Sequence, residues 1–333
     1  MSKKVVIIGC GAISEMWHIP VAVRLLGANN VAIVDSNRTR LEAVAQKFDI
    51  SSLAHELSGI KIALDTAIIG APPQFHPVIA KTAFATGLDV LCEKPLANSS
   101  QECAAMLEAA DAADKLLAVC HTARFFPNRL HVRKLLMEGA LGKIIRVDIE
   151  QGSVSNWPTL TGYSFRKDMV PGGVLLNEGI HSLDFLFWTF GKPMAYAYFD
   201  DSLGGVENNS KLRLSYQGDM SVDFRLSRSC ELANTIRIEG NKCVAEFGIY
   251  DLRSVDLSDG GRKERILCSD KKLNFLDAAE LQMMDFLACV DGKRKPRCSA
   301  LEGAAVVEFI EQCYSDKKKR NLPEKVPYPG YTW

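Results

Sequence analysis

A lysine and a histidine, far apart in the sequence, stand in settings where their side chains could move a proton. Lys94 lies in Glu93-Lys94-Pro95, directly after the apolar run 90–92. Proline fixes φ and lacks an N–H, so a strand over 90–92 must end there in a turn. Ligands bind at the carboxyl ends of strands in open α/β sheets, which places Lys94 beside a ligand. An isolated Glu–Lys pair is more often a solvated ion pair, so the surrounding motifs decide between the two readings.

His181 is predicted on a helix at about 174–190. Asn177 precedes it by four residues and Asp184 follows it by three, so all three fall on one helical stripe. Their neighbours are apolar, and a polar stripe on such a helix needs partners. Pro171-Gly172-Gly173 predicts a turn whose backbone approaches another group closely. A single histidine here also fits a core position, so its assignment depends on the other motifs.

The first βα turn of the chain predicts a dinucleotide site. Residues 5–9 read as a buried strand, and the turn Gly9-Cys10-Gly11-Ala12-Ile13-Ser14 follows. In such a turn, backbone N–H groups meet a pyrophosphate at a helix N-terminus. Ser14 stands where the fingerprint has its third glycine. The residues predicted to contact the cofactor here are Gly9, Gly11, Ala12 and Ile13.

Asp35 indicates which dinucleotide is bound. It ends the second predicted strand, 24 residues after Gly11. An acidic residue there accepts hydrogen bonds from ribose hydroxyls and repels a 2′-phosphate, so NAD is favoured. Arg38 and Arg40 lie close enough in the sequence to leave NADP possible. Asp35 could also cap the following helix.

The elements that position these residues change character near residue 124. Before it, short buried strands alternate with helices, which predicts a parallel Rossmann sheet over residues 1–123. Beyond it, longer alternating strands predict an α+β domain with a large, mostly antiparallel, open-faced sheet over residues 124–298. A last helix at about 299–316 is predicted to pack back on the first domain.

Composition excludes several classes of protein. Of 333 residues, 47% are hydrophobic and 24% charged, as in soluble globular proteins, and 40 Lys+Arg balance 40 Asp+Glu. Neither nucleic acid nor a membrane is therefore an expected partner. Ten cysteines without a Cys-x-x-Cys pair favour reduced thiols, and the N-terminal apolar run is too short for a signal peptide. We expect a cytoplasmic protein, and the His and Cys spacings predict no metal site.

The order of these motifs resembles the Gfo/Idh/MocA oxidoreductase family. The resemblance includes two further motifs. One is Ala71-Pro72-Pro73-x-x-His76, and the other begins with Gly172-Gly173 and ends with His181 and Asp184. The resemblance spans roughly residues 4–316. It implies NAD(P)-dependent oxidation or reduction of sugars, cyclitols and related polyols by homodimers or homotetramers. It implies cofactor contacts at Ala71, Pro72, His76, Glu93 and Lys94.

By position, Lys94 matches the family's active-site lysine and His181 its catalytic histidine. One of them must take or return the hydroxyl proton when a hydride leaves or reaches the carbon, and imidazole titrates near neutral pH. Many members have aspartate where this chain has Asn177. An amide can orient the ring but cannot stabilise its cationic form, so we expect proton transfer to shift toward Lys94. Arg166 could bind an anionic group of the substrate or stay a solvated loop charge.

The expected function is hydride transfer between nicotinamide and a secondary alcohol or ketone carbon of a sugar or polyol. Three alternatives stay open: a nucleotide-sugar dehydrogenase or reductase, a non-catalytic NAD-binding sensor or corepressor, and an imine or enone reductase. A sensor needs neither Lys94 nor His181, and an imine or enone reductase would tolerate loss of the histidine more readily.

Overall fold

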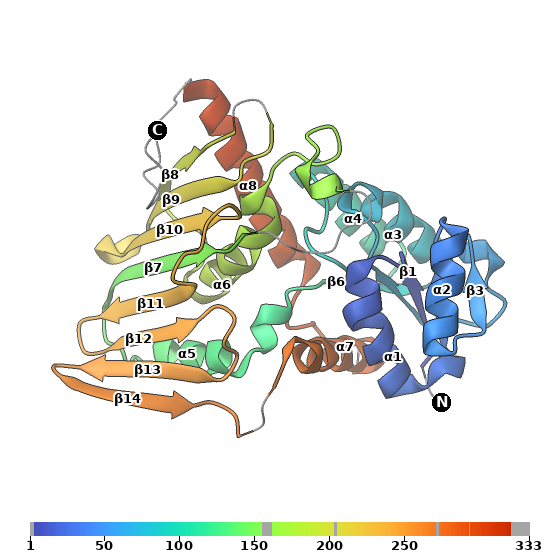
Figure 1. Cartoon of the computed structure of the whole chain (residues 1–333), viewed down its shortest axis with the longest axis horizontal. Coiled ribbons are helices and arrows are strands. Elements are labelled where there is room, and N and C mark those ends of the chain that lie inside the picture. The colour runs from blue at the N-terminus through green and yellow to red at the C-terminus, as the bar shows by residue number, and fades with distance from the viewer. Residues whose placement is uncertain (1–2, 155–161, 203–204, 271–272, 293, 321–333) are drawn as a thin grey trace. The chain divides into compact units, whose positions relative to one another are not determined.

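The computed structural model describes residues 3–154, 162–202, 205–270, 273–292 and 294–320. These residues form two compact units, each built on one sheet (Figure 1). The first unit contains the chain up to Thr122 and Phe275–Val307, and the second contains most of the chain between them and the segment from Glu308. The fold predicted from the sequence, a parallel Rossmann sheet and a larger, mostly antiparallel sheet, is confirmed.

The first unit is built on a six-stranded sheet in the order β3-β2-β1-β4-β5-β6, and all neighbouring strands are parallel. The strands are β1 (Val5–Ile8), β2 (Val31–Val34), β3 (Ser52–Ala54), β4 (Thr66–Ile69), β5 (Asp89–Cys92) and β6 (Leu117–Val119). β1, β2 and β4 are buried along their whole length, because helices cover both faces of such a sheet. The edge strand β3 is short and partly exposed, and the sequence pattern did not predict it.

Helices connect or cover these strands, and two of them begin at a side-chain cap. They are η1 (Ser14–His18), α1 (Ile19–Leu26), η2 (Ala28–Asn30), α2 (Arg38–Phe48), η3 (Leu57–Gly59), η4 (Pro73–Phe75), α3 (His76–Ala85), α4 (Ser100–Ala112) and α7 (Phe275–Gly292). The side chain of Asn37 accepts from Arg40 N at 3.0 Å before α2, and Ser99 accepts from Glu102 N at 3.2 Å before α4. Each cap satisfies one N–H that the first helical turn leaves unpaired.

Helix α7 belongs to the first unit, although the sequence pattern grouped it with the second domain. Met283 and Phe286 are each 1% exposed and lie in the same apolar core as Ile19. The rings of Trp17 and Phe275 stack with centroids 5.8 Å apart. An amphipathic pattern predicts that a helix buries one face, but it does not say against which sheet.

The second unit is built on an eight-stranded sheet in the order β14-β13-β12-β11-β7-β10-β9-β8. Its strands are β7 (Ile144–Gly152), β8 (Ala195–Asp200), β9 (Asn209–Ser215), β10 (Ser221–Ser227), β11 (Thr235–Gly240), β12 (Val244–Gly248), β13 (Ser254–Asp259) and β14 (Arg262–Leu267). Two meanders flank β7, which pairs parallel with β10 and antiparallel with β11. Alternate residues of β11, including Ile236 and Ile238, are buried, as expected for a sheet with one covered face.

Helices α5 (Pro127–Met137) and α6 (Ile180–Phe190) lie on one face of this sheet in Figure 1. The other helices are η5 (Thr122–Phe125), η6 (Tyr163–Phe165), η7 (Leu175–Gly179), η8 (Gln217–Asp219) and α8 (Ala300–Arg320). The boundary between the two units falls within α8, after Val307.

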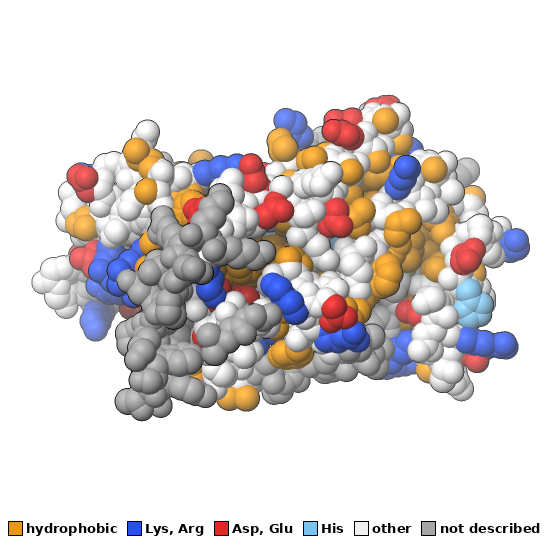
Figure 2. All heavy atoms as spheres, turned by 90° about the horizontal axis from the view of Figure 1, so that it is seen from above, with side chains coloured by type: hydrophobic (Ala, Val, Ile, Leu, Met, Phe, Trp, Pro, Cys, Tyr) orange, Lys and Arg blue, Asp and Glu red, His pale blue; other side chains and the backbone are white. Residues whose placement is uncertain are grey.

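Charged side chains of both signs occur across the face of the molecule shown in Figure 2. The pattern agrees with the balance of 40 basic and 40 acidic residues in the whole chain. Within the described part of the chain, every helix is too short or too polar to span a membrane.

Truncating Phe286 tests the assignment of α7 to the first core. Phe286→Ala removes a side chain that is 1% exposed, and we expect it to lower the free energy of unfolding by about 3–5 kcal/mol. Leu281→Ala on the same helix is the matched control, because Leu281 is 42% exposed. Urea unfolding followed by circular dichroism measures both, and equal effects of the two variants would contradict the assignment.

Candidate functional site

The residues predicted to bind the cofactor gather at one edge of the parallel sheet. Three of them, Gly9, Asp35 and Glu93, directly follow the carboxyl end of a strand, as do Gly70 and Cys120, which were not predicted to bind it. The backbone N–H of each donates to a carbonyl of the neighbouring strand, at 2.8, 3.3, 2.9, 2.9 and 2.8 Å respectively. These bonds extend the sheet by one residue per strand. The residues that follow are therefore held at defined positions relative to the sheet edge. The edge includes the switch point between β1 and β4, where dinucleotides bind in this topology.

The glycine turn depends on close backbone approach. Gly9 has φ +96°, and a Cβ there would meet Ala71 N at 2.6 Å. Ser14 is buried, and a Cβ on Gly70 would collide with its Oγ. Gly70 therefore supplies the space between helix and strand that the third fingerprint glycine usually supplies.

Asp35 is fixed by the turn that it faces. Its carboxylate accepts from Cys10 N and from Asn37 N, both at 2.7 Å. A carboxylate has about four acceptor positions, so it keeps capacity for ribose hydroxyls. Arg40 donates to Cys10 O at 2.7 Å and pairs with Glu15, and Arg38 is 2.8 Å from Glu42.

The residues at this edge fit a dinucleotide. Gly9, Gly11, Ala12, Ile13, Asp35, Ala71, Pro72 and Lys94 are all only partly buried, so a ligand can reach them. The Gly-x-Gly turn leads directly into the first helix, whose N-terminal backbone N–H groups suit a pyrophosphate. Because the nearby arginines are engaged with other groups, the arrangement suits NAD.

His76 is fully buried and links the two loops that flank Lys94. Its Nε2 lies 2.8 Å from Ala71 O, and its Nδ1 lies 3.1 and 3.2 Å from the carbonyl oxygens of Pro95 and Leu96. Burial lowers the pKa of His76, so the ring is neutral and donates to one of these sides at a time. Lys94 itself is partly buried and precedes a cis peptide bond to Pro95.

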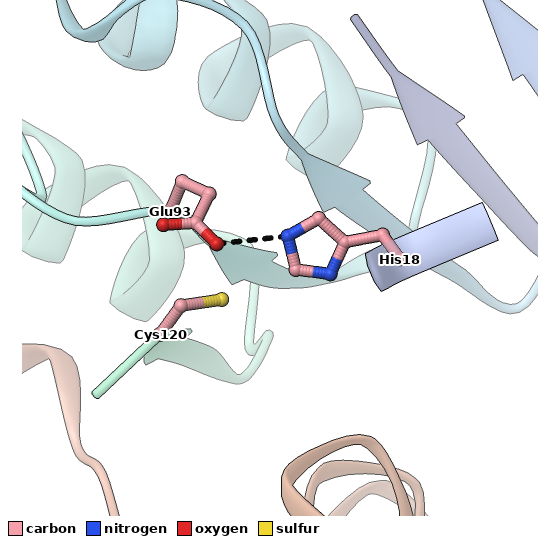
Figure 3. A group of neighbouring side chains, drawn as sticks. All are labelled: His18, Glu93 and Cys120. Carbon is pink, nitrogen blue, oxygen red and sulfur yellow. Dashed lines mark hydrogen bonds and ion pairs between the residues drawn. The ribbon is translucent and has the colours of Figure 1, made fainter. Parts of the chain in front are cut away.

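Two residues of this unit, His18 and Cys120, were not predicted from the sequence. Both are buried, and both lie against the carboxylate of Glu93 (Figure 3). Their only sequence signal was position: His18 follows Ser14 by four residues, and Cys120 follows a predicted strand.

The predicted helix around His181 begins with a π-helical turn. The π turn η7 covers Leu175–Gly179 and continues directly into α6. π turns often occur at functional sites. Asn177 and His181 are both partly buried, and Gly179 lies so near β10 that a Cβ would meet Leu226 Cδ1 at 2.5 Å. The glycine therefore lets the helix pack tightly on the sheet.

The start of this helix is held by Glu207, a further residue that was not predicted. Its carboxylate accepts from Gly173 N at 2.7 Å, from Leu175 N at 3.0 Å and from Tyr314 Oη at 2.7 Å. A Cβ on Gly172 or Gly173 would collide with Tyr314 or with the Glu207 backbone. The group that the Gly-Gly turn approaches is thus the protein itself. Burial raises the pKa of Glu207, although these three donors act in the opposite direction.

The carboxylates near His181 are engaged by arginines. Asp184 is 1% exposed and accepts two bonds from Arg124, at 2.9 and 2.7 Å. Glu178 lies 3.3 Å from Arg228 and accepts from Asn177 Nδ2 at 3.3 Å. Neither carboxylate carries a free negative charge beside the helix.

Arg166 is an exposed loop residue paired with Asp168 at 2.6 Å. This contact is typical of a solvated loop charge. A role of Arg166 in substrate binding stays a prediction. Lys94 belongs to the first unit and His181 to the second. The contacts described above fix the position of each residue within its own unit.

The parallel sheet and the glycine turn at its carboxyl edge define a dinucleotide-binding Rossmann domain. Residues 3–121 match the family model described as "Oxidoreductase family, NAD-binding Rossmann fold", and residues 130–246 match the C-terminal domain of the same family. The chain belongs to the Gfo/Idh/MocA family of oxidoreductases.

Several known proteins are similar to this chain. Trans-1,2-dihydrobenzene-1,2-diol dehydrogenase of Mus musculus is 28% identical over 70% of this chain and 71% of its own length. D-glucoside 3-dehydrogenase of Escherichia coli is 27% identical over 57% of this chain and 54% of its own length, so the match spans about half of that relative. Levoglucosan dehydrogenase, solved with NADH and levoglucosan, superposes with a TM-score of 0.85 at 16% identity over 97% of this chain and 98% of its own. This structural likeness shows the fold.

The pH dependence of unfolding tests the buried carboxyl of Glu207. Its raised pKa, compared with about 4.3 for an unfolded glutamate, means that the folded state binds this proton more tightly. Its stabilising contribution is complete below roughly pH 4 and falls as the pH rises through the raised pKa. The free energy of unfolding of wild type minus that of Glu207→Gln should therefore decrease over this interval, as measured by urea unfolding.

The control is Glu308→Gln on α8, because Glu308 forms an exposed pair with Lys192. The free energy of unfolding of this variant, measured over the same pH range, gives the baseline for removing an exposed carboxylate. A difference that grew with pH for Glu207→Gln would contradict the direction of its pKa shift.

Proposed function

We propose that this oxidoreductase transfers a hydride between NAD and a secondary alcohol or ketone carbon of a sugar, cyclitol or related polyol. Lys94 and His181 handle the proton. The observation that carries this function is the placing of Lys94 at the carboxyl edge of the NAD-binding sheet, in a turn held by buried His76 and Glu93.

Bound NAD would supply the carbon that accepts or returns the hydride. Gly9, Gly11, Ala12 and Ile13 would hold its pyrophosphate, and Asp35 its adenosine ribose. Ala71, Pro72 and the Glu93-Lys94 turn would contact the rest of the cofactor. His76 is fully buried, so we assign it the role of positioning the Ala71 and Pro95 loops.

The proton at the substrate oxygen falls to Lys94 and His181. Asn177 can orient the imidazole through its amide, but it cannot stabilise an imidazolium with a full negative charge. The engagement of Asp184 by Arg124 and of Glu178 by Arg228 supports this point, because neither is a free substitute for an aspartate at 177. Lys94 therefore carries the larger share of the proton transfer.

The substrate class is inferred from the names of relatives. The proteins named above act on a cyclic diol, a glucoside and an anhydrosugar, according to their names. These compounds share a ring carbon that bears a secondary hydroxyl group. The chemistry of Lys94 and His181 requires such a carbon, and it requires no phosphate or nucleotide group.

Narrower expectations from the sequence stay predictions. They are use of NADP, a cytoplasmic location, assembly into a homodimer or homotetramer, and binding of an anionic group by Arg166. None of them is needed for hydride transfer as proposed here.

Replacing Lys94 tests the proposed division of the proton transfer. With a panel of levoglucosan, methyl glucosides, inositols and a cyclic trans-diol, Lys94→Met should lower kcat by about 100-fold or more. His181→Gln should lower kcat less, by about tenfold. Lys81→Met is the control, because Lys81 lies exposed on α3. A loss of no more than about tenfold for Lys94→Met, roughly 1.4 kcal/mol, would remove Lys94 from the proton transfer.

The cofactor preference depends on Asp35. The wild-type protein should bind NADH more tightly than NADPH, because the Asp35 carboxylate repels a 2′-phosphate. Asp35→Ser should reduce that preference by about tenfold, or about 1.4 kcal/mol, as measured by fluorescence titration. Asp111→Asn, an exposed position on α4, should leave the preference unchanged. A wild-type preference for NADPH would refute the assignment of Asp35.

A further inference from the structure

Three buried side chains from distant parts of the first unit meet behind the Lys94 turn. His18 on η1, Glu93 after β5 and Cys120 after β6 are 5%, 7% and 1% exposed. Figure 3 shows the imidazole of His18 pointing at the carboxylate of Glu93, with the thiol of Cys120 beside them. The cofactor contact predicted for Glu93 does not explain why its carboxylate is buried against a histidine and a thiol.

The carboxylate of Glu93 connects His18 to the backbone of Lys94. Its Oε1 lies 2.8 Å from His18 Nε2, and its Oε2 accepts from Lys94 N at 3.0 Å. The backbone of Glu93 is fixed as well, because its N–H donates to Ile69 O at 2.9 Å. A rotation of this carboxylate would break the bond to the Lys94 amide.

Burial alone would raise the pKa of Glu93. The hydrogen bond from His18, the charges of His18 and Lys94, and the Lys94 amide outweigh it and hold this pKa below its ordinary value. The ionised carboxylate is thus maintained by the groups it connects. Without these partners the buried carboxylate would be strongly destabilising.

The surroundings of Glu93 hold other titratable groups. His76 and Cys92 are fully buried neighbours that sense its charge, and Cys120 is another. Burial, and then the charge of Glu93, raises the pKa of the Cys120 thiol well above its ordinary value. The thiol therefore stays protonated beside the carboxylate.

The same three side chains could in principle share a metal ion. Their ligand atoms lie within 4.8 Å of one another, and a histidine, a carboxylate and a cysteine are all zinc ligands. However, the direct bond of 2.8 Å between His18 and Glu93 already uses two of these atoms.

We propose that His18 is a positioning residue for Lys94, acting through the carboxylate of Glu93. The bond from His18 fixes the carboxylate, the carboxylate fixes the Lys94 amide, and the Lys94 ammonium group is thereby held where it meets the substrate oxygen. This assignment rests on the proposed function of Lys94.

Two substitutions at His18 separate this role from a purely structural one. His18→Ala should lower kcat by about tenfold or more, while KM and the Kd for NADH stay within about twofold. His18→Gln should recover kcat to within about threefold of wild type, because its amide N–H can still donate to Glu93. The substrate is the panel member that turns over fastest, and NADH is the probe of cofactor binding. His131→Gln on α5 of the second unit is the matched control.

A third variant covers the case in which His18→Ala does not fold. Glu93→Gln keeps an acceptor for the backbone N–H of Lys94. It removes the negative charge that interacts with the Lys94 ammonium group. Without that charge, the neutral amine of Lys94 becomes more favourable relative to the ammonium form. The limb of the pH–rate profile that reports Lys94 should therefore move to lower pH by roughly one unit. An unchanged profile would contradict the coupling of Glu93 to Lys94.

Two further results would overturn the role of His18. One is a parallel loss of kcat and NADH affinity in His18→Ala without recovery in His18→Gln, which would indicate a structural role only. The other is binding of Co²⁺ with a thiolate-to-cobalt absorption band that Cys120→Ser removes, which would identify a metal centre. Lys94→Met in the same assays separates the two proposals. If Lys94→Met loses activity and His18→Ala keeps it, only the role of His18 is overturned. If both variants keep activity, the proposed function of Lys94 is overturned as well.

Discussion

The backbone hydrogen bonds of the parallel sheet continue one residue beyond the strands, and the site depends on these last bonds. A strand that leaves a buried sheet must find partners for its N–H and C=O groups. Here the N–H groups of Gly9, Gly70, Glu93 and Cys120 find them on the neighbouring strand, at 2.8–2.9 Å. Four loops are therefore attached to one rigid edge before any side chain makes a contact. The glycine turn and Lys94 have fixed positions within the unit for this reason.

The second requirement is that buried polar groups have partners. The carboxylate of Glu93 is satisfied by His18 and the Lys94 amide, and that of Glu207 by the first N–H groups of the helix before His181 and by Tyr314. Removing one partner from such a group costs more than the bond itself contributes. In each unit, a buried carboxylate thus holds the turn or helix that presents a proposed catalytic side chain.

The sequence predicted the elements better than their pairing. The strands from β8 to β13 were expected close to their observed positions, because alternating apolar residues and tight turns are local signals. The insertion of β7 between β10 and β11, parallel to β10, has no such signal, since it is set by which sheet edge is free. Helix α7 was placed with the wrong neighbours for a related reason. Its apolar face fits any apolar surface, and only the packing of Phe286 and Phe275 in the first unit decides.

By itself, the sequence determined the Rossmann turn, the carboxylate at Asp35, the Glu-Lys-Pro turn and the helix of His181. Each is encoded by neighbouring residues whose backbone preferences and spacing are local. Only the tertiary structure decided what holds them. His18 reaches Glu93 across 75 positions of sequence, and Gly70 makes room for Ser14. The engagement of Asp184 by Arg124 likewise became visible only in the folded chain. Such contacts depend on which strands are neighbours in the sheet. The local sequence around each residue does not encode that strand order.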